Sequence, residues 1–316
     1  MKNLKLLLVS LAILFSHNLT MGQGPKDGKN EKNPVKSALN AFKFRSIGPA
    51  FMSGRIADIA IDPKNENVWY VAVGSGGVWK TENSGTTWTP LADNMPFYST
   101  GCITIDPHNN ASIWLGTGEN VGGRHVGIGH GVYHSKDGGK SWKDMGLKKS
   151  EHISKIIVHP DDPNTVWVAS QGPLWSPGGE RGLFKTTNGG KTWKNTLDIN
   201  EWTGVTDLVI DPNNPNILYA ASWQKHRNVA ALIGGGPGTS LYKSVDGGDN
   251  WSKIDKGLPR SNKGKIGLAI SPMQPNVLYA AVELDKRAGA VYRSDNSGGS
   301  WKKMSDTVSG GTGPHY

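Results

Sequence analysis

Cysteine is almost absent from this sequence: Cys102 is the only one among 316 residues. A lone cysteine excludes a disulfide within the chain, and its place in the apolar run 101–105 indicates a buried thiol rather than a nucleophile. Sustained helical periodicity is also missing outside the N-terminal segment. These two absences argue against a helical bundle and against a small disulfide-stabilised fold.

Acidic residues are in the minority, with 26 Asp and Glu against 35 Lys and Arg and a formal net charge of +9. A basic protein of this kind is a candidate for nucleic-acid binding. However, the lysines are scattered, some lie in turns (Lys140 and Lys191), and no basic stripe alternates with aromatic residues. We therefore expect a solvated basic surface and no nucleic-acid partner.

Long apolar runs are absent except for residues 6–15. This run follows a lysine-bearing start, is too short to span a bilayer, and precedes small residues at Thr20 and Gly22. The pattern predicts a signal peptide over residues 1–22, and thus an exported protein (periplasmic, cell-surface or secreted) with no transmembrane anchor in the mature segment. Residues 23–41, rich in Gly, Asn, Lys and Pro, predict a flexible basic linker.

Glycine and tryptophan are abundant, with 42 and 12 copies, and with many Val, Ile and Thr they indicate an all-β protein. One motif, Ser/Thr-x-Asp/Asn-x-Gly-x-x-Trp, occurs five times, at residues 81–88, 135–142, 186–193, 244–251 and 294–301. Its tryptophans follow one another at intervals of 50 to 58 residues. That spacing is typical of a propeller or a similar repeat array.

The motif is typical of a tight turn between two strands. Its Asp or Asn can accept hydrogen bonds from backbone amides two residues on, its glycine supplies a positive φ, and its tryptophan buries apolar surface under the turn. We therefore predict a structural role for the turn residues of all five copies: Asn83 and Trp88, Asp137 and Trp142, Asn188 and Trp193, Asp246 and Trp251, and Asn296 and Trp301.

A second pattern, an apolar strand end, a Pro/Asn turn and another strand, recurs in step with the motif (IDPKNENVWYVA from Ile61). One unit then contains four strands, A to D, over residues 57–61, 68–73, 77–81 and 87–92. The sequence predicts a β-propeller of four-stranded antiparallel blades over residues 42–316, with five blades present. Because residues 42–49 resemble a D strand without a blade of its own, we expect an N-terminal closing strand and a larger ring.

The connections between strands B and C differ from blade to blade, whereas the A–B and C–D turns repeat. In a meander these two sets lie on opposite faces, so we expect binding on the B–C face. The long B–C loops span residues 118–130, 171–181, 224–239 and 283–289. Their candidate ligand-binding residues are Arg124, His125, Trp175, Arg181, Arg227 and Arg287. Such residues suit an acidic or carbohydrate ligand; alternatively, the loop charges solubilise the face and pair with one another.

With these repeats, the chain resembles the bacterial-neuraminidase-repeat (Asp-box) propellers, and among them the sortilin N-terminal-domain-like exported proteins of bacteria. Besides the five motif copies, the resemblance rests on GTGEN (116–120), GGGPG (234–238) and GLAISP (267–272). It implies a large propeller that binds peptide or protein ligands. The repeat is specific for the fold and says little about function.

Two enzyme families share the repeat. Sialidases carry an N-terminal Phe/Tyr-Arg-Ile-Pro, which Arg45 in FRSIGP resembles only with extra residues inserted, and no Tyr–Glu pair is evident. Xyloglucanase-type endoglucanases, more distantly similar, carry a catalytic Asp in Tyr-Ala-Arg-Thr-Asp-Val-Gly-Gly, and the matching YVAVGSGG places Gly74 at the Asp. Because glycosidases need two carboxyl groups at a defined separation, Glu119 and Glu180 are the remaining catalytic candidates.

Metal and cofactor motifs are missing. His125, His130 and His134 are five and four residues apart on a Gly-rich loop, unlike zinc ligands, and no phosphate-binding or nucleophile motif is present. We therefore predict no metal and no cofactor. The sequence favours a protein-, peptide- or glycan-binding module. The alternative is a glycoside-hydrolase-like enzyme acting on polysaccharide, with catalytic carboxylates in the B–C loops or in a further C-terminal part.

Overall fold

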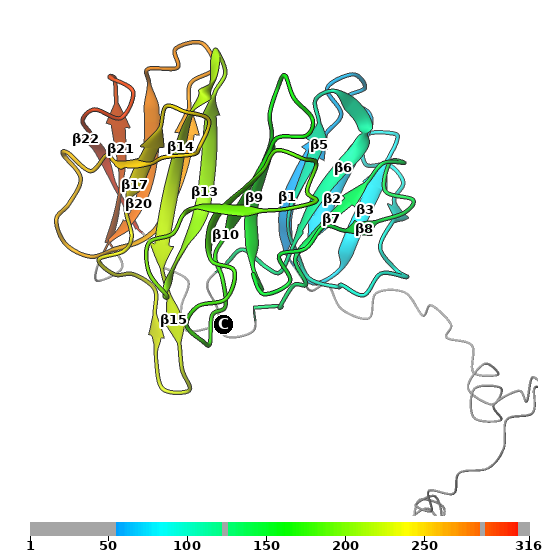
Figure 1. Cartoon of the computed structure of the whole chain (residues 1–316), viewed down its shortest axis with the longest axis horizontal. Helices are drawn as coiled ribbons and strands as arrows, with labels where there is room; N and C mark the ends of the chain where they lie inside the picture. The colour runs from blue at the N-terminus through cyan, green and yellow to red at the C-terminus, as the bar shows by residue number, and fades with distance from the viewer. Residues whose placement is uncertain (1–54, 122–125, 285–287, 309–316) are drawn as a thin grey trace, which may run out of the picture. The chain divides into compact units, whose positions relative to one another are not determined.

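The computed structural model describes residues 55–121, 126–284 and 288–308. The predicted signal peptide, linker and closing strand lie outside these ranges, as do Arg124, His125 and Arg287. Within the ranges the chain forms β-strands and no α-helix, and so no helix that could cross a membrane (Figure 1). The all-β prediction is confirmed for this part of the chain.

The described residues form five four-stranded antiparallel sheets, or blades, whose strands A to D pair in chain order. Blade one has β1 (Ile56–Ile61), β2 (Trp69–Val73), β3 (Gly77–Thr81) and β4 (Thr89–Pro90). Blade two has β5 (Thr100–Asp106), β6 (Asn109–Thr117), β7 (Val132–Ser135) and β8 (Lys143–Asp144). Blade three has β9 (Ile153–Val158), β10 (Val166–Ser170), β11 (Gly182–Thr186) and β12 (Lys194–Leu197).

The last two blades complete the set. Blade four has β13 (Thr203–Asp211), β14 (Asn214–Gln224), β17 (Leu241–Ser244) and β18 (Ser252–Lys253), and a hairpin of β15 (His226–Arg227) and β16 (Leu232–Ile233) is inserted before β17. Blade five has β19 (Lys263–Ile270), β20 (Leu278–Leu284), β21 (Ala288–Ser294) and β22 (Lys302–Val308).

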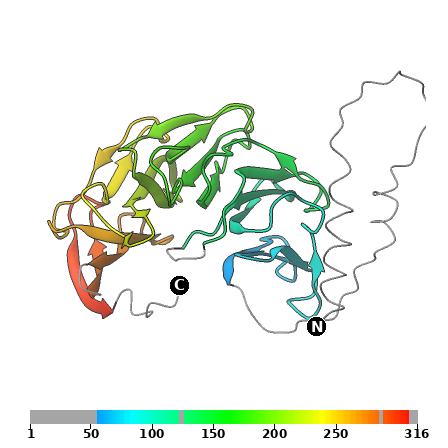
Figure 2. The same cartoon turned by 90° about the horizontal axis from the view of Figure 1, so that it is seen from below.

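Strand A of each blade packs beside strand A of the next, in the order β1, β5, β9, β13 and β19. Figure 2 shows the blades following one another in chain order. An apolar cluster lies at each of the four junctions, for example Trp114 of blade two with Ile156 and Phe184 of blade three. Burial between neighbouring blades is the arrangement expected of a propeller, and the predicted fold is confirmed.

The first and fifth blades each keep an exposed apolar face. Ile59 and Ile61 of β1 are 50% and 51% exposed, and Tyr279 of β20 is 38% exposed. In blade three, by contrast, β10 is buried along its whole length. Open faces of this kind fit the prediction that these five blades are part of a larger ring.

Close packing at the inner strands explains why small residues recur there. A Cβ on Gly116 would lie 2.5 Å from Ile153 Cγ2 and 2.6 Å from Cys102 Sγ, so no larger residue fits. Cys102 is fully buried, and this burial raises the pKa of its thiol. The prediction of a buried, free thiol is confirmed.

All five Asp-box turns share one hydrogen-bond pattern, as in blade two. The Ser135 hydroxyl donates to Asp137 Oδ1 (2.8 Å) and accepts from Gly139 N (2.8 Å), while Asp137 Oδ1 accepts from Ser141 N (2.9 Å). The Asp therefore accepts a hydrogen bond from the amide four residues on, whereas the sequence predicted the amide two residues on. The positive φ of Gly139 (87°) turns the chain back toward the carboxylate. The other four turns repeat these bonds.

Most of the tryptophans that end the motif also form a hydrogen bond to the preceding blade. Three of them donate an indole hydrogen bond to a carbonyl of the blade before: Trp142 to Leu91 (3.1 Å), Trp193 to Met145 (2.7 Å) and Trp301 to Ile254 (2.9 Å). Trp88 of blade one has no preceding blade among the described residues and is 40% exposed, while its ring lies edge-on to Trp69 of its own blade with the ring centres 6.4 Å apart.

Each Asp-box turn lies beside the A–B turn of its own blade. In blade two Gly138 N donates to Ala111 O (2.8 Å), and matching bonds join the two turns in the other four blades. The B–C loops are therefore on the opposite face, as predicted. In blade five, however, Glu283 and Gly289 are paired residues of β20 and β21, so the predicted loop 283–289 is wrong at its ends.

Candidate functional site

Three connections meet on the B–C face of blades three and four. They are the B–C loop 171–181, the connection that leads into β13, and the β15–β16 hairpin. Backbone hydrogen bonds join them, since Arg227 N donates to Leu174 O (2.9 Å) and Lys225 N donates to Trp202 O (3.2 Å). Loops that depart from the repeat are thus held together as one surface.

Trp175, Trp202 and His226 form what we call the aromatic patch on this surface. Trp175 is 50% exposed, and the Trp202 and His226 rings lie 4.3 Å apart. The Arg227 guanidinium lies 5.5 Å from the centre of the Trp175 ring but is itself only 7% exposed. Arg227 therefore supports Trp175 by a cation–π contact, and Trp175 is the member that faces solvent.

Arg181 lies inside loop 171–181 and is 3% exposed. Its guanidinium donates to the carbonyl oxygens of Gln171 (2.9 Å), Ser176 (3.0 Å) and Gly178 (3.1 Å). Burial lowers the pKa of Arg181 to about 10, which leaves it charged at neutral pH. Its donors therefore shape the loop that presents Trp175, whereas the sequence predicted that they would bind the ligand.

Glu119 lies on the B–C face of blade two and is 2% exposed. Arg55 Nη2 donates to both of its carboxylate oxygens (2.7 and 2.8 Å), and Gly127 N and Ser75 Oγ donate as well (2.9 and 3.3 Å). With Arg55 and Gly74 it lines a cavity of about 290 Å³. The carboxylate thus already has an ion-pair partner and accepts hydrogen bonds from two further donors.

Gly74, the position matched to the xyloglucanase Asp, is directly beside this carboxylate. A Cβ at residue 74 would lie 2.5 Å from Glu119 Oε1, so the carboxylate occupies the space of a side chain there. Glu180 accepts from Lys149 N (2.7 Å) and lines a different cavity, of about 570 Å³, with residues 146–149. Among the described residues, the two catalytic candidates therefore line different cavities.

A polar network that the sequence did not predict links blades two to five at the B–C end. Lys225 Nζ donates to Gln171 Oε1 (2.6 Å), Gln171 Nε2 to Asn120 O (3.1 Å) and Lys265 Nζ to the same carbonyl (2.6 Å). Lys225 is 1% exposed, and burial, with the charge of Lys265 nearby, lowers its pKa well below the usual range. This network holds the bases of the loops in place. Of its residues, only Asn120 belongs to a motif noted in the sequence, the GTGEN segment.

Metal ligation finds no support in the described residues, which contain no group of three or more His, Cys, Asp or Glu side chains able to hold an ion. His134 instead stacks on Trp114, with the ring centres 4.1 Å apart. His125 lies outside the described ranges.

The chain is similar to several known propeller proteins. The model of the sortilin (neurotensin receptor 3) family matches residues 130–258. A xyloglucanase of Hypocrea jecorina (strain QM6a) is 22% identical over 301 residues, which are 85% of this chain and 34% of that protein. The chain spans about a third or less of the first curated relatives that it matches.

The solved structures that are similar to this chain are also propellers. An ancestral GH74 enzyme superposes with a TM-score of 0.62 at 25% identity, over 79% of this chain and 31% of that one. YCF48 bound to D1 peptide superposes with a TM-score of 0.51 at 18% identity, over 82% of this chain and 70% of that one, which bears on the fold alone. The chain is therefore an Asp-box β-propeller similar to sortilin-like and xyloglucanase-type propellers.

Proposed function

We propose that this propeller is a ligand-binding module whose B–C face binds a glycan or a protein through the aromatic patch. The observation that carries the proposal is the half-exposed ring of Trp175, supported by Arg227 and presented by a loop that Arg181 holds in shape. Rigid, exposed tryptophans provide stacking surfaces for sugar rings and contact area for proteins. The candidate carboxylates Glu119 and Glu180, in contrast, already accept hydrogen bonds from other groups.

The comparisons support both ligand classes. Xyloglucanases act on a polysaccharide, which favours a glycan, whereas YCF48 with its D1 peptide and the sortilin-family match favour a peptide or protein. The glycan is the first ligand to test, because the xyloglucanase similarity covers 85% of the chain.

Binding to xyloglucan oligosaccharides, measured by isothermal titration calorimetry, tests the proposal. Trp175→Ala should weaken binding by at least about tenfold, in line with the loss of one stacking side chain. Trp88→Ala is the matched control, because Trp88 is a similarly exposed tryptophan in an Asp-box turn on the opposite face. Equal loss in both variants, or none in Trp175→Ala, would contradict the assignment. If no oligosaccharide binds, the same pair of variants is tested against a peptide library.

The alternative function is a glycosidase-like hydrolase, favoured by the similarity to xyloglucanases. It requires catalytic carboxylates in the B–C loops, where Glu119 and Glu180 are the candidates, or in a further C-terminal part. Of the two candidates, Glu119 is held by Arg55, and the two line different cavities. Release of reducing ends from xyloglucan decides between the functions. Turnover by the wild-type chain that Glu119→Gln or Glu180→Gln abolishes would establish hydrolysis; a binding module shows no turnover in any of the three proteins.

We also propose that the protein is exported, on the strength of the N-terminal pattern. The predicted signal peptide and linker are outside the described residues. N-terminal sequencing of the mature protein should begin at Gln23, and a mature chain that keeps Met1 would contradict export by this route.

A further inference from the structure

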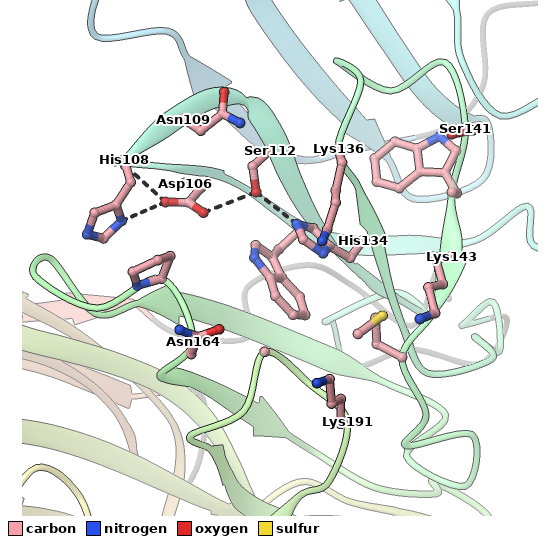
Figure 3. Close-up of a pocket in the computed structure, with 15 residues that line it drawn as sticks. Asp106, His108, Asn109, Ser112, His134, Lys136, Ser141, Lys143, Asn164 and Lys191 are labelled. Atoms are coloured by element: carbon pink, nitrogen blue, oxygen red, sulfur yellow. Dashed lines mark hydrogen bonds and ion pairs between the residues drawn. The ribbon is translucent and has the colours of Figure 1, made fainter.

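A large cavity lies on the Asp-box face, between blades two and three. Its volume is about 650 Å³, within the range of sites that take small molecules. Figure 3 shows a chain of hydrogen bonds from His108 to His134 along one wall, with Asn164 and Lys191 across from it. The sequence assigned this face to scaffold alone, so the cavity is a feature that the repeat does not account for.

The two junctions that follow along the chain are bridged where this one is open. Between blades three and four, Trp167 Nε1 donates to Gly247 O (3.0 Å), and Lys185 Nζ, from the residue paired with Trp167, lies 3.1 Å from Asp249 Oδ1. Between blades four and five, Lys243 Nζ donates to Ser297 O (3.1 Å). Each bond runs from one blade to the Asp-box turn of the next.

At the open junction the same two positions are Trp114 and His134. Trp114 Nε1 is buried and has no hydrogen-bond partner among the described residues, unlike Trp167 Nε1. The shorter His134 stacks flat on Trp114 and bonds through Nε2 to Ser112 Oγ (2.8 Å), within its own blade. The space that a lysine fills in blades three and four is therefore left empty, with a buried donor beside it.

Charge at this cavity is predominantly positive. Lys136, Lys143 and Lys191 line it and are exposed. At the turn position where blade four has Asp249, blade three has Lys191, so the sign of the charge is reversed. Asp106 is the single carboxylate in the lining, and it already accepts from Ser112 Oγ (3.1 Å) and pairs with His108 Nδ1 (2.8 Å).

We propose that this cavity is a second binding site and that it takes a sugar carrying a carboxylate group, such as a uronic acid residue. The lysines match the carboxylate. Asn109 and Asn164 offer amides for hydroxyl groups, and Trp142 and Met145 supply the apolar surface that a sugar ring contacts. The site is on the face opposite the aromatic patch, so it goes beyond the proposed function and does not depend on it.

Titration of the whole chain with digalacturonic acid by calorimetry tests the proposal, beside cellobiose as a neutral disaccharide and inorganic phosphate as a plain anion. We expect saturable binding of the uronate disaccharide that weakens as salt rises, with cellobiose and phosphate at least about tenfold weaker. The proposal would be overturned if cellobiose and phosphate both bound as tightly as digalacturonic acid, or if phosphate alone did so. It would also be overturned if digalacturonic acid did not bind.

Two variants locate the binding. Lys143→Ala/Lys191→Ala should weaken it by at least about tenfold, whereas Lys140→Ala, a neighbouring turn lysine outside the lining, should not. Binding that survives the loss of the lysine pair would place the sugar elsewhere and refute the site.

Discussion

The position of the Glu119 carboxylate requires a glycine at residue 74, because the carboxylate occupies the space that a side chain there would need. A Cβ at residue 74 would lie 2.5 Å from Glu119 Oε1. In xyloglucanase-type propellers, the resemblance places a catalytic Asp at this position. Here the carboxylate beside Gly74 comes from blade two and is bound by Arg55.

Replacing Arg55 with alanine removes the charged partner of a carboxylate that is 2% exposed. We expect the free energy of unfolding to fall by about 2–3 kcal/mol, less than for a fully buried pair because Arg55 is 34% exposed. Urea unfolding measures this. Adding Glu119→Gln should recover part of the loss, since a neutral amide costs less to bury than an unpaired carboxylate. A double variant no more stable than Arg55→Ala would contradict this account.

At the scale of the element, the Asp-box turn uses an acceptor oxygen and does not require a charge. Asp137 and Asn188 accept the same hydrogen bond, from Ser141 N (2.9 Å) and Thr192 N (3.0 Å). In Asp137 the hydrogen bond from the Ser141 hydroxyl, followed by the one from its amide, lowers the carboxyl pKa to about 2. The turn therefore holds the ionised form of Asp137.

Asp137→Asn should keep the turn and remove part of the acid sensitivity. A lowered carboxyl pKa stabilises the fold above the unfolded value near 4 and loses that stabilisation as the pH falls toward about 2. We expect similar melting temperatures for wild type and Asp137→Asn at pH 7, and a smaller decrease for the variant between pH 4 and pH 2. Asp137→Ala, which lacks the acceptor, should lose about 0.5–2 kcal/mol at pH 7, with binding at the aromatic patch unchanged. Parallel pH curves for wild type and Asp137→Asn would refute this account of the turn.

The blade could be predicted from the sequence because its signals are local. Each turn is specified by residues within eight positions, and the shared glycine of all five turns has a φ between 80° and 87°. In blade one the predicted strands A to C end within one residue of β1 to β3, while β4 is shorter than its predicted range, as short as β8 and β18 in blades two and four.

The candidate site was less predictable because it is made by contacts between distant residues. Arg55 and Glu119 are 64 positions apart, and Lys225 and Gln171 are 54 apart. Arginine in a variable loop suggested ligand binding, but Arg181 turned inward, since the Gly-rich loop around it brings several carbonyls within reach of one guanidinium. Composition locates such loops without giving the direction of their side chains.

At the scale of the whole molecule, stability depends on the junctions, because each blade contacts mainly its neighbours. Most junctions combine an apolar cluster with an indole hydrogen bond to the preceding blade. The junction between blades two and three also contains the cavity of about 650 Å³ and the Trp114 Nε1 donor, which has no hydrogen-bond partner among the described residues. It should therefore be the junction most sensitive to losing its indole hydrogen bond.

Trp193→Phe tests this, because Trp193 Nε1 donates to Met145 O (2.7 Å) across that junction and its ring meets Trp114 edge-on at 6.4 Å. Phenylalanine keeps most of the apolar contact and loses the hydrogen bond, so we expect a loss of about 1 kcal/mol. Hydrogen exchange should then accelerate in β8 and β12 before it does in blade five. Trp301→Phe, which removes the matching bond at the last junction, is the control and should reverse that order. Uniform acceleration in both variants would show that the blades unfold as one cooperative unit and that the open junction is no weaker than the others.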